Sequence, residues 1–405
     1  MGYKNQAIQG VSWLGAQRIV TRVLSFGRTA LLARLLTPSQ FGTFGIAIIV
    51  LSFMEIVTET GINVFLTQKK ETIDKYINTA WVVSILRGSI ISIIIFLSAP
   101  LISGFFNTPQ ATNLLMIISL VPLLRGFINP SIVIFVKDLH FKKEFLYRTS
   151  VFFVESIFTI VFVLVFESFY GLAYGLVVGS LYEVVLSFII IKPRPTFQFT
   201  KLQFREVVGR GKWLTLAGVF NYLYHNGDDI VVGRLLGTSS LGLYEMAYRI
   251  SMLPITEISN TISKVTFPIF VKINEDRVRM RHAYYKSITA IALIVIPMGL
   301  IFFIFPTQII KIVLGEQWVE AGSVLQVLAI FGVIQSLAIS IVSPLYALDK
   351  QEYITVITLV SLVGLGVTIV PFVQTYGLVG AGYSALVGSL LSLPFSIYYL
   401  RKVLF

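Results

Sequence analysis

The sequence contains no cysteine and little charge. Without cysteine it can form no disulfide bond, no thiolate metal site and no cysteine nucleophile. The three histidines, His140, His225 and His282, lie far apart, and none has carboxylates at metal-ligand spacing. We therefore predict no metal site and no cofactor. Charged residues make up 13% of the 405, against roughly 25% in soluble proteins, which excludes an ordinary water-soluble protein.

Apolar residues take the place of the missing charge. They form 56% of the chain, and the mean hydropathy is +0.83. A membrane-spanning helix needs about 20 apolar residues. Such stretches predict an all-α polytopic membrane protein with about twelve transmembrane helices, near 10–35, 42–67, 77–104, 112–136, 146–167, 171–191, 209–235, 243–270, 284–305, 323–347, 353–373 and 378–400. The even number places both termini on one side of the membrane.

Lysine and arginine gather on one side of these predicted spans. With the N-terminus inside, the inner segments hold 22 of the 32 basic residues, and the outer segments hold only Arg34, Arg234 and Lys311. Because basic residues are retained on the cytoplasmic side, both termini are predicted to be cytoplasmic. The bias also accounts for the net charge of +12 without a nucleic-acid partner.

Two stretches of the first half recur in the second half. An offset of 200 places residues 34–36 on 234–236, and an offset of 209 places 171–181 on 380–390 with six identities in eleven positions. Both matches fall at corresponding places of two six-span halves, which predicts parallel repeats related by an axis along the membrane normal. The predicted six-helix lobes are residues 1–200 and 201–405, joined by the basic linker 192–212. Two lobes around a cavity are typical of a transporter.

Charged residues occur inside the predicted spans. Each costs at least ~2.5 kcal/mol at mid-membrane, so each should face protein or a wet cavity and find a partner. They are Arg18, Arg22, Arg28, Glu55, Glu59, Arg87, Arg125, Glu155, Glu183, Asp228, Asp229, Arg249, Glu257 and Lys264.

Depth suggests how these charges pair. In a helical hairpin, residues equidistant from the turn lie at equal depth, because each helix rises 1.5 Å per residue. The predicted turns lie near Pro38–Ser39, between spans 4 and 5, and near residues 238–239. Matching residues at equal depth about these turns predicts four ion pairs. They are Arg22–Glu55, Arg18–Glu59, Arg125–Glu155 and Asp228–Arg249.

Arg28 has no acid at its depth within its own hairpin, because the matching residue is Ile49. Three interpretations stay open. Arg28 binds a phosphate of an anionic substrate, as a planar multidonor cation suits. It bridges to Asp228 or Asp229 in the other lobe and holds an outer gate shut. Or it extends toward the membrane interface without a specific role.

The sequence resembles a known family at several motifs. The end of the first span, residues 32–42 (LARLLTPSQFG), resembles the opening motif of the polysaccharide transporter family. Residues 226–237 (NGDDIVVGRLLG) form the most specific block, followed by similar residues at 241–249, 267–270 and 314–318. These are Wzx-type flippases for lipid-linked oligosaccharides, within the multidrug/oligosaccharidyl-lipid/polysaccharide exporter superfamily. Some relatives have two further C-terminal spans, whereas this chain reaches Phe405 after its twelfth.

The resemblance implies a MATE-like fold of two six-helix lobes. It implies alternating access that moves an undecaprenyl-pyrophosphate-linked sugar repeat to the outer leaflet of the bacterial inner membrane, for lipopolysaccharide, exopolysaccharide or capsule. Membrane lipid and the polysaccharide polymerase machinery are the further partners implied. Arginines suit the anionic pyrophosphate, and the predicted substrate-binding residues are Arg18, Arg22, Arg28 and Arg125. The predicted coupling or gating residues are Glu55, Glu59, Asp228, Asp229, Arg249 and Glu257.

Other functions are weighed against this one. A cation-coupled multidrug exporter of the same superfamily is the alternative, with Asp228, Asp229 and Glu257 as its coupling carboxylates. A membrane polymerase or ligase would need a large external loop, whereas the predicted outer loops are short. A scaffold for the biosynthetic machinery would not need so many buried charges. We therefore predict a transporter and no enzyme.

Overall fold

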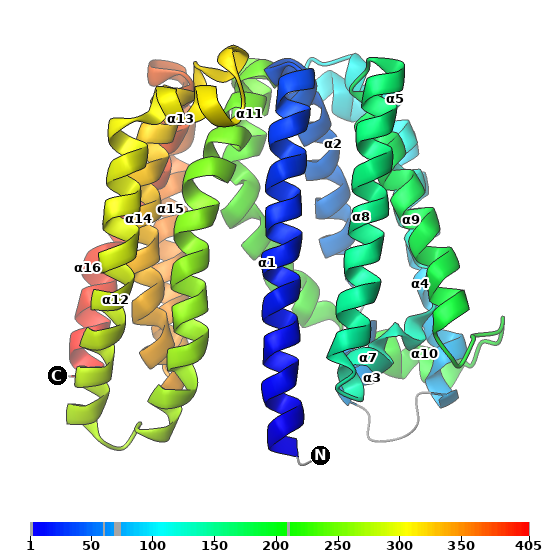
Figure 1. Ribbon diagram of the computed structural model, residues 1–405, viewed down its shortest axis with the longest axis horizontal. Coiled ribbons are helices and arrows are strands. Elements are labelled where there is room, and N and C mark those ends of the chain that lie inside the picture. Colours follow the sequence, from blue (N-terminus) through cyan, green and yellow to red (C-terminus); the bar gives the residue numbers. More distant parts are fainter. Residues whose placement is uncertain (1–2, 60, 69–73, 209–210, 405) are drawn as a thin grey trace. The chain divides into compact units, whose positions relative to one another are not determined.

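The computed structural model describes residues 3–59, 61–68, 74–208 and 211–404, and all regular structure in these residues is helical. The chain divides into two compact units, Met1–Gly227 and Asp228–Phe405. Figure 1 shows the helices of each unit running mainly along one direction. The described chain is thus an all-α polytopic membrane protein, as predicted. The predicted lobes of residues 1–200 and 201–405 stay a prediction.

The first unit begins with the long helix α1, which runs alongside α8 (Figure 1). The short helices α3, α7 and α10 lie together at one end of the unit. The element bounds are α1 Tyr3–Leu35, α2 Pro38–Val57, α3 Ile62–Gln68, α4 Asp74–Phe105, α5 Gln110–Ile118, α6 Leu120–Gly126, η1 Pro130–Val133, α7 Ile134–Lys137, α8 Phe141–Phe166, α9 Tyr170–Ile190 and α10 Lys201–Val208.

The helix α11, Gly211–Lys272, passes from the first unit into the second. In the second unit α12, α14, α15 and α16 pack as a bundle, and Ser336 on α14 donates a hydrogen bond to the Ile255 carbonyl of α11 at 3.1 Å. The remaining bounds are α12 Arg277–Ile304, α13 Pro306–Val313, η2 Glu316–Trp318, α14 Ala321–Ala347, α15 Gln351–Tyr376 and α16 Leu378–Leu404.

The structure confirms two turns that the sequence predicted. Between α1 and α2 the chain turns at Thr37, whose side chain accepts from the Gln40 amide while Gln40 caps the Thr37 amide in return. Pro38 suits this first helical position because it has no amide hydrogen to satisfy. In α11 the helical backbone breaks at Gly237, with φ 83° and ψ −178°, values that favour glycine. This break lies beside the turn predicted near 238–239.

Some predicted spans are broken helices. The predicted span 42–67 ends at Val57 and resumes as α3, and the predicted span 112–136 bends by 70° between Gln110–Gly126 and Pro130–Lys137. Among the described residues, eight helices are long and apolar enough to cross a membrane, or nine with the bent pair as one span. The other three of the twelve predicted spans lie on α1 and the two arms of α11, which are helical but carry charge along their length.

The recurring stretch 171–181/380–390 marks the same kind of packing in both units. On α9, Gly171, Gly175 and Gly179 face α8, and a Cβ on Gly175 would lie 1.9 Å from the Thr159 hydroxyl. On α16, Gly380 and Gly388 face α15 in the same way, and a Cβ on Gly380 would lie 2.0 Å from a carbonyl oxygen. Small residues at four-residue spacing let membrane helices approach closely. The repeat therefore conserves a tight helix pair within each unit.

Candidate functional site

A cavity of about 230 Å³ lies inside the first unit, with walls from α2, α3, α4, α6, η1, α8 and α9. Ionisable side chains at membrane depth are costly and mark functional sites by default. Six of them line this cavity: Glu55, Glu59, Arg87, Arg125, Arg148 and Glu183. Three are arginines and three are glutamates, so the formal charges of the lining balance.

The crossing of α4 and α6 brings two of the arginines to the cavity. A Cβ on Gly88 of α4 would lie 2.3 Å from the Pro122 carbonyl oxygen, and a Cβ on Gly126 of α6 would lie 2.8 Å from the Ser84 carbonyl oxygen. Only glycine permits this backbone contact. Arg87 and Arg125 directly precede the two glycines and both line the cavity, so the close crossing brings them to one place.

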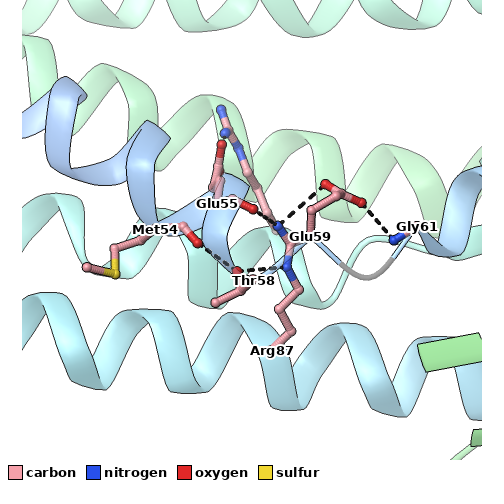
Figure 2. A network of polar contacts seen from close by, with 7 residues as sticks. Met54, Glu55, Thr58, Glu59, Gly61 and Arg87 are labelled. Carbon is pink, nitrogen blue, oxygen red and sulfur yellow. Dashed lines mark hydrogen bonds and ion pairs between the residues drawn. The ribbon is translucent and has the colours of Figure 1, made fainter. Parts of the chain in front are cut away.

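Arg87 is bound to the C-terminal end of α2 (Figure 2). Its Nε donates to the Thr58 hydroxyl at 3.1 Å, and its Nη2 donates to the Glu55 backbone carbonyl. Nη2 also lies 3.7 Å from a carboxylate oxygen of Glu59, whose other oxygen accepts from the Gly61 amide at 3.0 Å. A cation at a helix C-terminus satisfies orphan carbonyls and complements the helix dipole. Arg87 therefore holds the broken end of α2 in place.

Arg125 makes fewer contacts with the protein than Arg87 does. Its Nη1 donates to Oε1 of Glu55 at 2.8 Å, and the two side chains are 37% and 33% exposed. Such an end-on contact uses one of the five donor hydrogens of a guanidinium, whereas a forked contact with two parallel bonds is stronger. Arg125 can thus offer donors to an anion that enters the cavity.

The far wall of the cavity carries Arg148 and Glu183. Nε of Arg148 donates to Glu144 one helical turn away at 3.1 Å, and the Tyr147 hydroxyl donates to the backbone carbonyl of Glu183 at 3.3 Å. The Glu183 carboxylate lies within electrostatic range of both Arg125 and Arg148. An anionic group beside this wall would therefore be attracted by Arg125 and Arg148 and repelled by Glu183.

Arg28 lies outside this cavity lining. It pairs with Glu155 of α8, Nη1 to Oε1 at 2.8 Å, and its guanidinium lies 4.9 Å from the centre of the Phe152 ring. The prediction that its own hairpin offers no acid is confirmed, because the partner comes from α8. In the described structure Glu155 holds Arg28 in the first unit, and Tyr244 binds Asp228 in the second.

The predicted pairings must be corrected. Depth matching assigned Arg22 to Glu55, Arg18 to Glu59 and Arg125 to Glu155, but the partners found are Arg125, Arg87 and Arg28 respectively. Arg18 and Arg22 have exposed side chains on α1. The helical rise gives the depth of each charged residue in the membrane, but it does not tell which neighbouring helix faces that residue. Each acid found an arginine on a helix outside its own hairpin.

The second unit contains a cluster of acids on α11. Asp228 is 7% exposed and accepts from the Tyr244 hydroxyl at 2.7 Å, and Arg249 lies 3.7 Å from Glu245 one turn away. The predicted Asp228–Arg249 pair is therefore wrong, because Tyr244 and Glu245 are the nearer partners. Asp229 follows Asp228, and Glu257 lies half-buried farther along the helix. Among the described residues no group of three or more His, Asp or Glu side chains is arranged to hold a metal ion.

Sequence reasoning missed Arg87, Arg148 and Glu183 as site residues. The sequence does contain a signal for Arg87. The tripeptide Leu-Arg-Gly occurs at 86–88 and again at 124–126, each time within an apolar run. An arginine followed by glycine in two neighbouring spans indicates a close helix crossing that brings two cations together.

Comparisons with known proteins agree with this architecture. A family model described as "Polysaccharide biosynthesis protein" matches residues 31–323. The chain is 25% identical to the lipopolysaccharide biosynthesis protein WzxC of Escherichia coli K12, over 87% of this chain and 72% of that protein. It is 24% identical to the teichuronic acid biosynthesis protein TuaB of Bacillus subtilis 168, over 82% of this chain and 69% of that protein.

Two solved structures have the same fold. The lipid II flippase MurJ in an inward closed conformation gives a TM-score of 0.78 at 16% identity, over 96% of this chain and 87% of that one. An inward-facing multidrug resistance MATE family transporter of the MOP superfamily gives 0.73 at 14% identity, over 97% of each chain. The predicted MATE-like fold is thereby confirmed.

Proposed function

This chain belongs to the polysaccharide biosynthesis protein family, and we propose that it is a flippase for a lipid-linked oligosaccharide. It moves an undecaprenyl-pyrophosphate-linked sugar repeat from the inner to the outer leaflet by alternating access. Relatives named for lipopolysaccharide and teichuronic acid biosynthesis, and the fold shared with a lipid II flippase, support this proposal. The polymer is a bacterial lipopolysaccharide, exopolysaccharide or capsule.

Arg125 is the residue that most directly supports this proposal. It lies in a membrane-embedded cavity with one end-on contact to Glu55, so its remaining donors can bind a pyrophosphate. Arg87 is bound at the end of α2 and acts as a positioning residue. Glu55 is the resting counter-ion of Arg125, and the substrate takes its place. A balanced cavity of this kind spares the empty transporter an uncompensated charge in the membrane.

We propose that this chain is a multi-pass protein of the bacterial inner membrane and that both of its termini lie in the cytoplasm. Its concentration of basic residues in the inner segments supports this orientation. It performs transport and no chemical step, it takes no cofactor and no nucleic acid, and it works beside membrane lipid and the polysaccharide polymerase machinery.

Cation-coupled drug export is the second candidate, and the acid cluster of α11 favours it. Asp229 and Glu245 lie near Arg249, whereas Asp228 is bound by the Tyr244 hydroxyl, so carboxyl groups outnumber the arginine in this part of the second unit and could bind a cation. The fold shared with a multidrug transporter is compatible with either function.

Deleting the gene in its bacterial host separates the two functions. Flippase activity predicts loss of the surface polysaccharide together with lipid-linked oligosaccharide trapped on the cytoplasmic leaflet. The wild-type gene should restore the polymer, and Arg125→Ala, at equal protein level, should not. Unchanged polysaccharide with altered tolerance of cationic dyes would contradict the flippase and favour drug export.

A further inference from the structure

We infer that the linker segment 192–204 binds the anionic headgroups of membrane phospholipids with one face, while its other face is fixed to the first unit. The binding face consists of six exposed side chains, which we call the linker surface: Lys192, Phe197, Phe199, Lys201, Leu202 and Phe204. The inference concerns the lipid around the chain, so it does not depend on the substrate that the chain transports.

The inner face of the segment is fixed by hydrogen bonds to α4. Asn78 accepts from the Thr196 amide at 2.8 Å and donates to the side chain of Gln198 at 3.0 Å. The Thr79 hydroxyl donates to the side chain of Gln203 on α10 at 2.7 Å. These contacts determine which face of the segment lies against α4 and which face is left for another partner.

The start of the segment is fixed by η1 and α9. The buried side chains of Asn129 and Ser131 both donate to the Pro193 carbonyl, at 3.1 and 2.8 Å. Nε of Arg194 donates to the Phe188 carbonyl in the last turn of α9 at 2.8 Å. The segment thus begins directly at the end of a helix that is long and apolar enough to cross a membrane.

The contacts with α4 place the linker surface at the boundary of the membrane. On α4 the apolar stretch Lys75–Phe105 is long enough to cross a membrane. Thr79 and Trp81 lie about 6–9 Å inside its start, because a helix rises 1.5 Å per residue. The ring of Phe197 lies 4.5 Å from the ring of Trp81. The segment is therefore level with the first turns of a span, where lipid headgroups are found, and α10 lies with α3 and α7 at this end of the first unit (Figure 1).

The apolar side chains of the linker surface are large and exposed. Phe197 is 73% exposed, Phe199 52% and Leu202 71%. Aromatic residues are enriched at the membrane–water interface, and segments that lie in this interface combine such apolar residues with lysine and arginine. At this depth, lipid is the partner that can cover these side chains.

The charge of the segment indicates which lipid it binds. Residues 192–204 contain three basic residues and no acid. Lys192 and Lys201 are exposed, and within the part of the chain that the structure describes neither lysine takes part in an ion pair. Basic residues beside a membrane attract anionic lipids, and each contributes about fivefold in affinity near the surface. The linker surface therefore favours an anionic headgroup over a zwitterionic one.

Fluorescence quenching with the full-length chain in vesicles tests this inference. The chain has no cysteine, so Leu202→Cys can be labelled with bimane at one position. In mixed vesicles, spin-labelled phosphatidylglycerol should quench this bimane more strongly than spin-labelled phosphatidylcholine, and aqueous iodide should quench it weakly. Bimane at Glu275→Cys, exposed in the loop after α11, should be quenched by iodide and serves as the control. If Leu202→Cys does not fold, Phe199→Cys gives the same readout from a second exposed position.

A paired replacement of lysines separates headgroup recognition from apolar contact. Lys192→Gln with Lys201→Gln leaves the apolar side chains in place, so the preference for phosphatidylglycerol should fall roughly fivefold to thirtyfold. Lys272→Gln with Lys286→Gln removes the same charge from exposed positions near the loop after α11 and should leave the preference unchanged.

Three results would overturn the inference. Strong iodide quenching at position 202, with none by either lipid, would show that the segment faces water. Equal quenching by the two lipids would show apolar contact without recognition of an anionic headgroup. Displacement of phosphatidylglycerol by an equal amount of undecaprenyl pyrophosphate would show that the linker surface binds the proposed substrate instead of the surrounding phospholipid.

Discussion

Arg87 and Arg125 occupy the same position of the same Leu-Arg-Gly tripeptide, yet the structure holds them in different ways. Arg87 binds the Thr58 hydroxyl, the Glu55 carbonyl and the Glu59 carboxylate, whereas Arg125 has the single end-on contact with Glu55. At the scale of the residue, the number of protein partners therefore distinguishes a positioning arginine from one that can exchange its partner for a ligand.

We expect Arg125→Ala to lose transport by roughly tenfold or more, since a charge-assisted hydrogen bond contributes about 1.5–3 kcal/mol. Because Glu55 loses one end-on contact and is itself 33% exposed, the melting temperature should fall less than in Arg87→Ala. Arg125→Lys should retain part of the activity, because it keeps the charge but not the fork. Flipping of a labelled lipid-linked oligosaccharide in vesicles measures this, and full activity of Arg125→Ala would refute its binding role.

Arg87→Ala should behave in the opposite way. It leaves the carbonyl end of α2 and the Glu59 carboxylate without their cation, so the melting temperature in detergent and the protein level should fall. A stable, well-expressed Arg87→Ala that has lost only transport would show that Arg87 binds substrate directly.

The residue types of the site could be predicted from the sequence, but their partners could not. Charges stand out in apolar spans, and their depth follows from the helical rise. Glu55, however, lies at the depth of both Arg22 and Arg125, and only the three-dimensional packing of α2 against its neighbours decides between them. The Glu155 carboxylate was likewise assigned to Arg125 and is bound to Arg28.

At the scale of the element, hydropathy finds spans but not their interruptions. The predicted span 42–67 runs through the break after Val57, because hydropathy averaged over a whole span hides the short polar stretch at residues 58–61. The turn at Thr37 was predictable, since Thr37, Pro38 and Gln40 form a recognisable helix start. Gly237 likewise marked the turn in α11.

The crossing of α4 and α6 depends on glycine at 88 and 126. Gly88→Ala would place a Cβ 2.3 Å from the Pro122 carbonyl oxygen, so the helices must separate, at a cost of about 1–3 kcal/mol. We expect a lower melting temperature and reduced transport. Gly104→Ala on the same helix meets no atom within 4 Å and is the matched control. Equal behaviour of the two variants would show that the close crossing does not support the site.

At the scale of the whole molecule, the two units share tight helix pairs but differ in charge. Three membrane acids of the first unit, at 55, 59 and 155, each pair with an arginine from another helix, whereas in the second unit Asp228 is bound by a tyrosine hydroxyl and Glu245 pairs with Arg249 on its own helix. Two units that differ in charge are suited to unlike tasks, and we propose anion binding in the first unit, with the acid cluster of the second unit available to a cation.

The orientation of this molecule is open to a direct test, because the chain has no cysteine and single cysteines can be labelled without background. The basic loop after α11 is expected inside and the loop after α15 outside. In intact cells, a membrane-impermeant maleimide should therefore label Gln374→Cys, whose side chain is exposed at the end of α15, and should not label Glu275→Cys, also exposed. Permeabilised cells should show labelling of both, which controls for reactivity. The reverse pattern would invert the membrane orientation, and with it the proposed direction of transport.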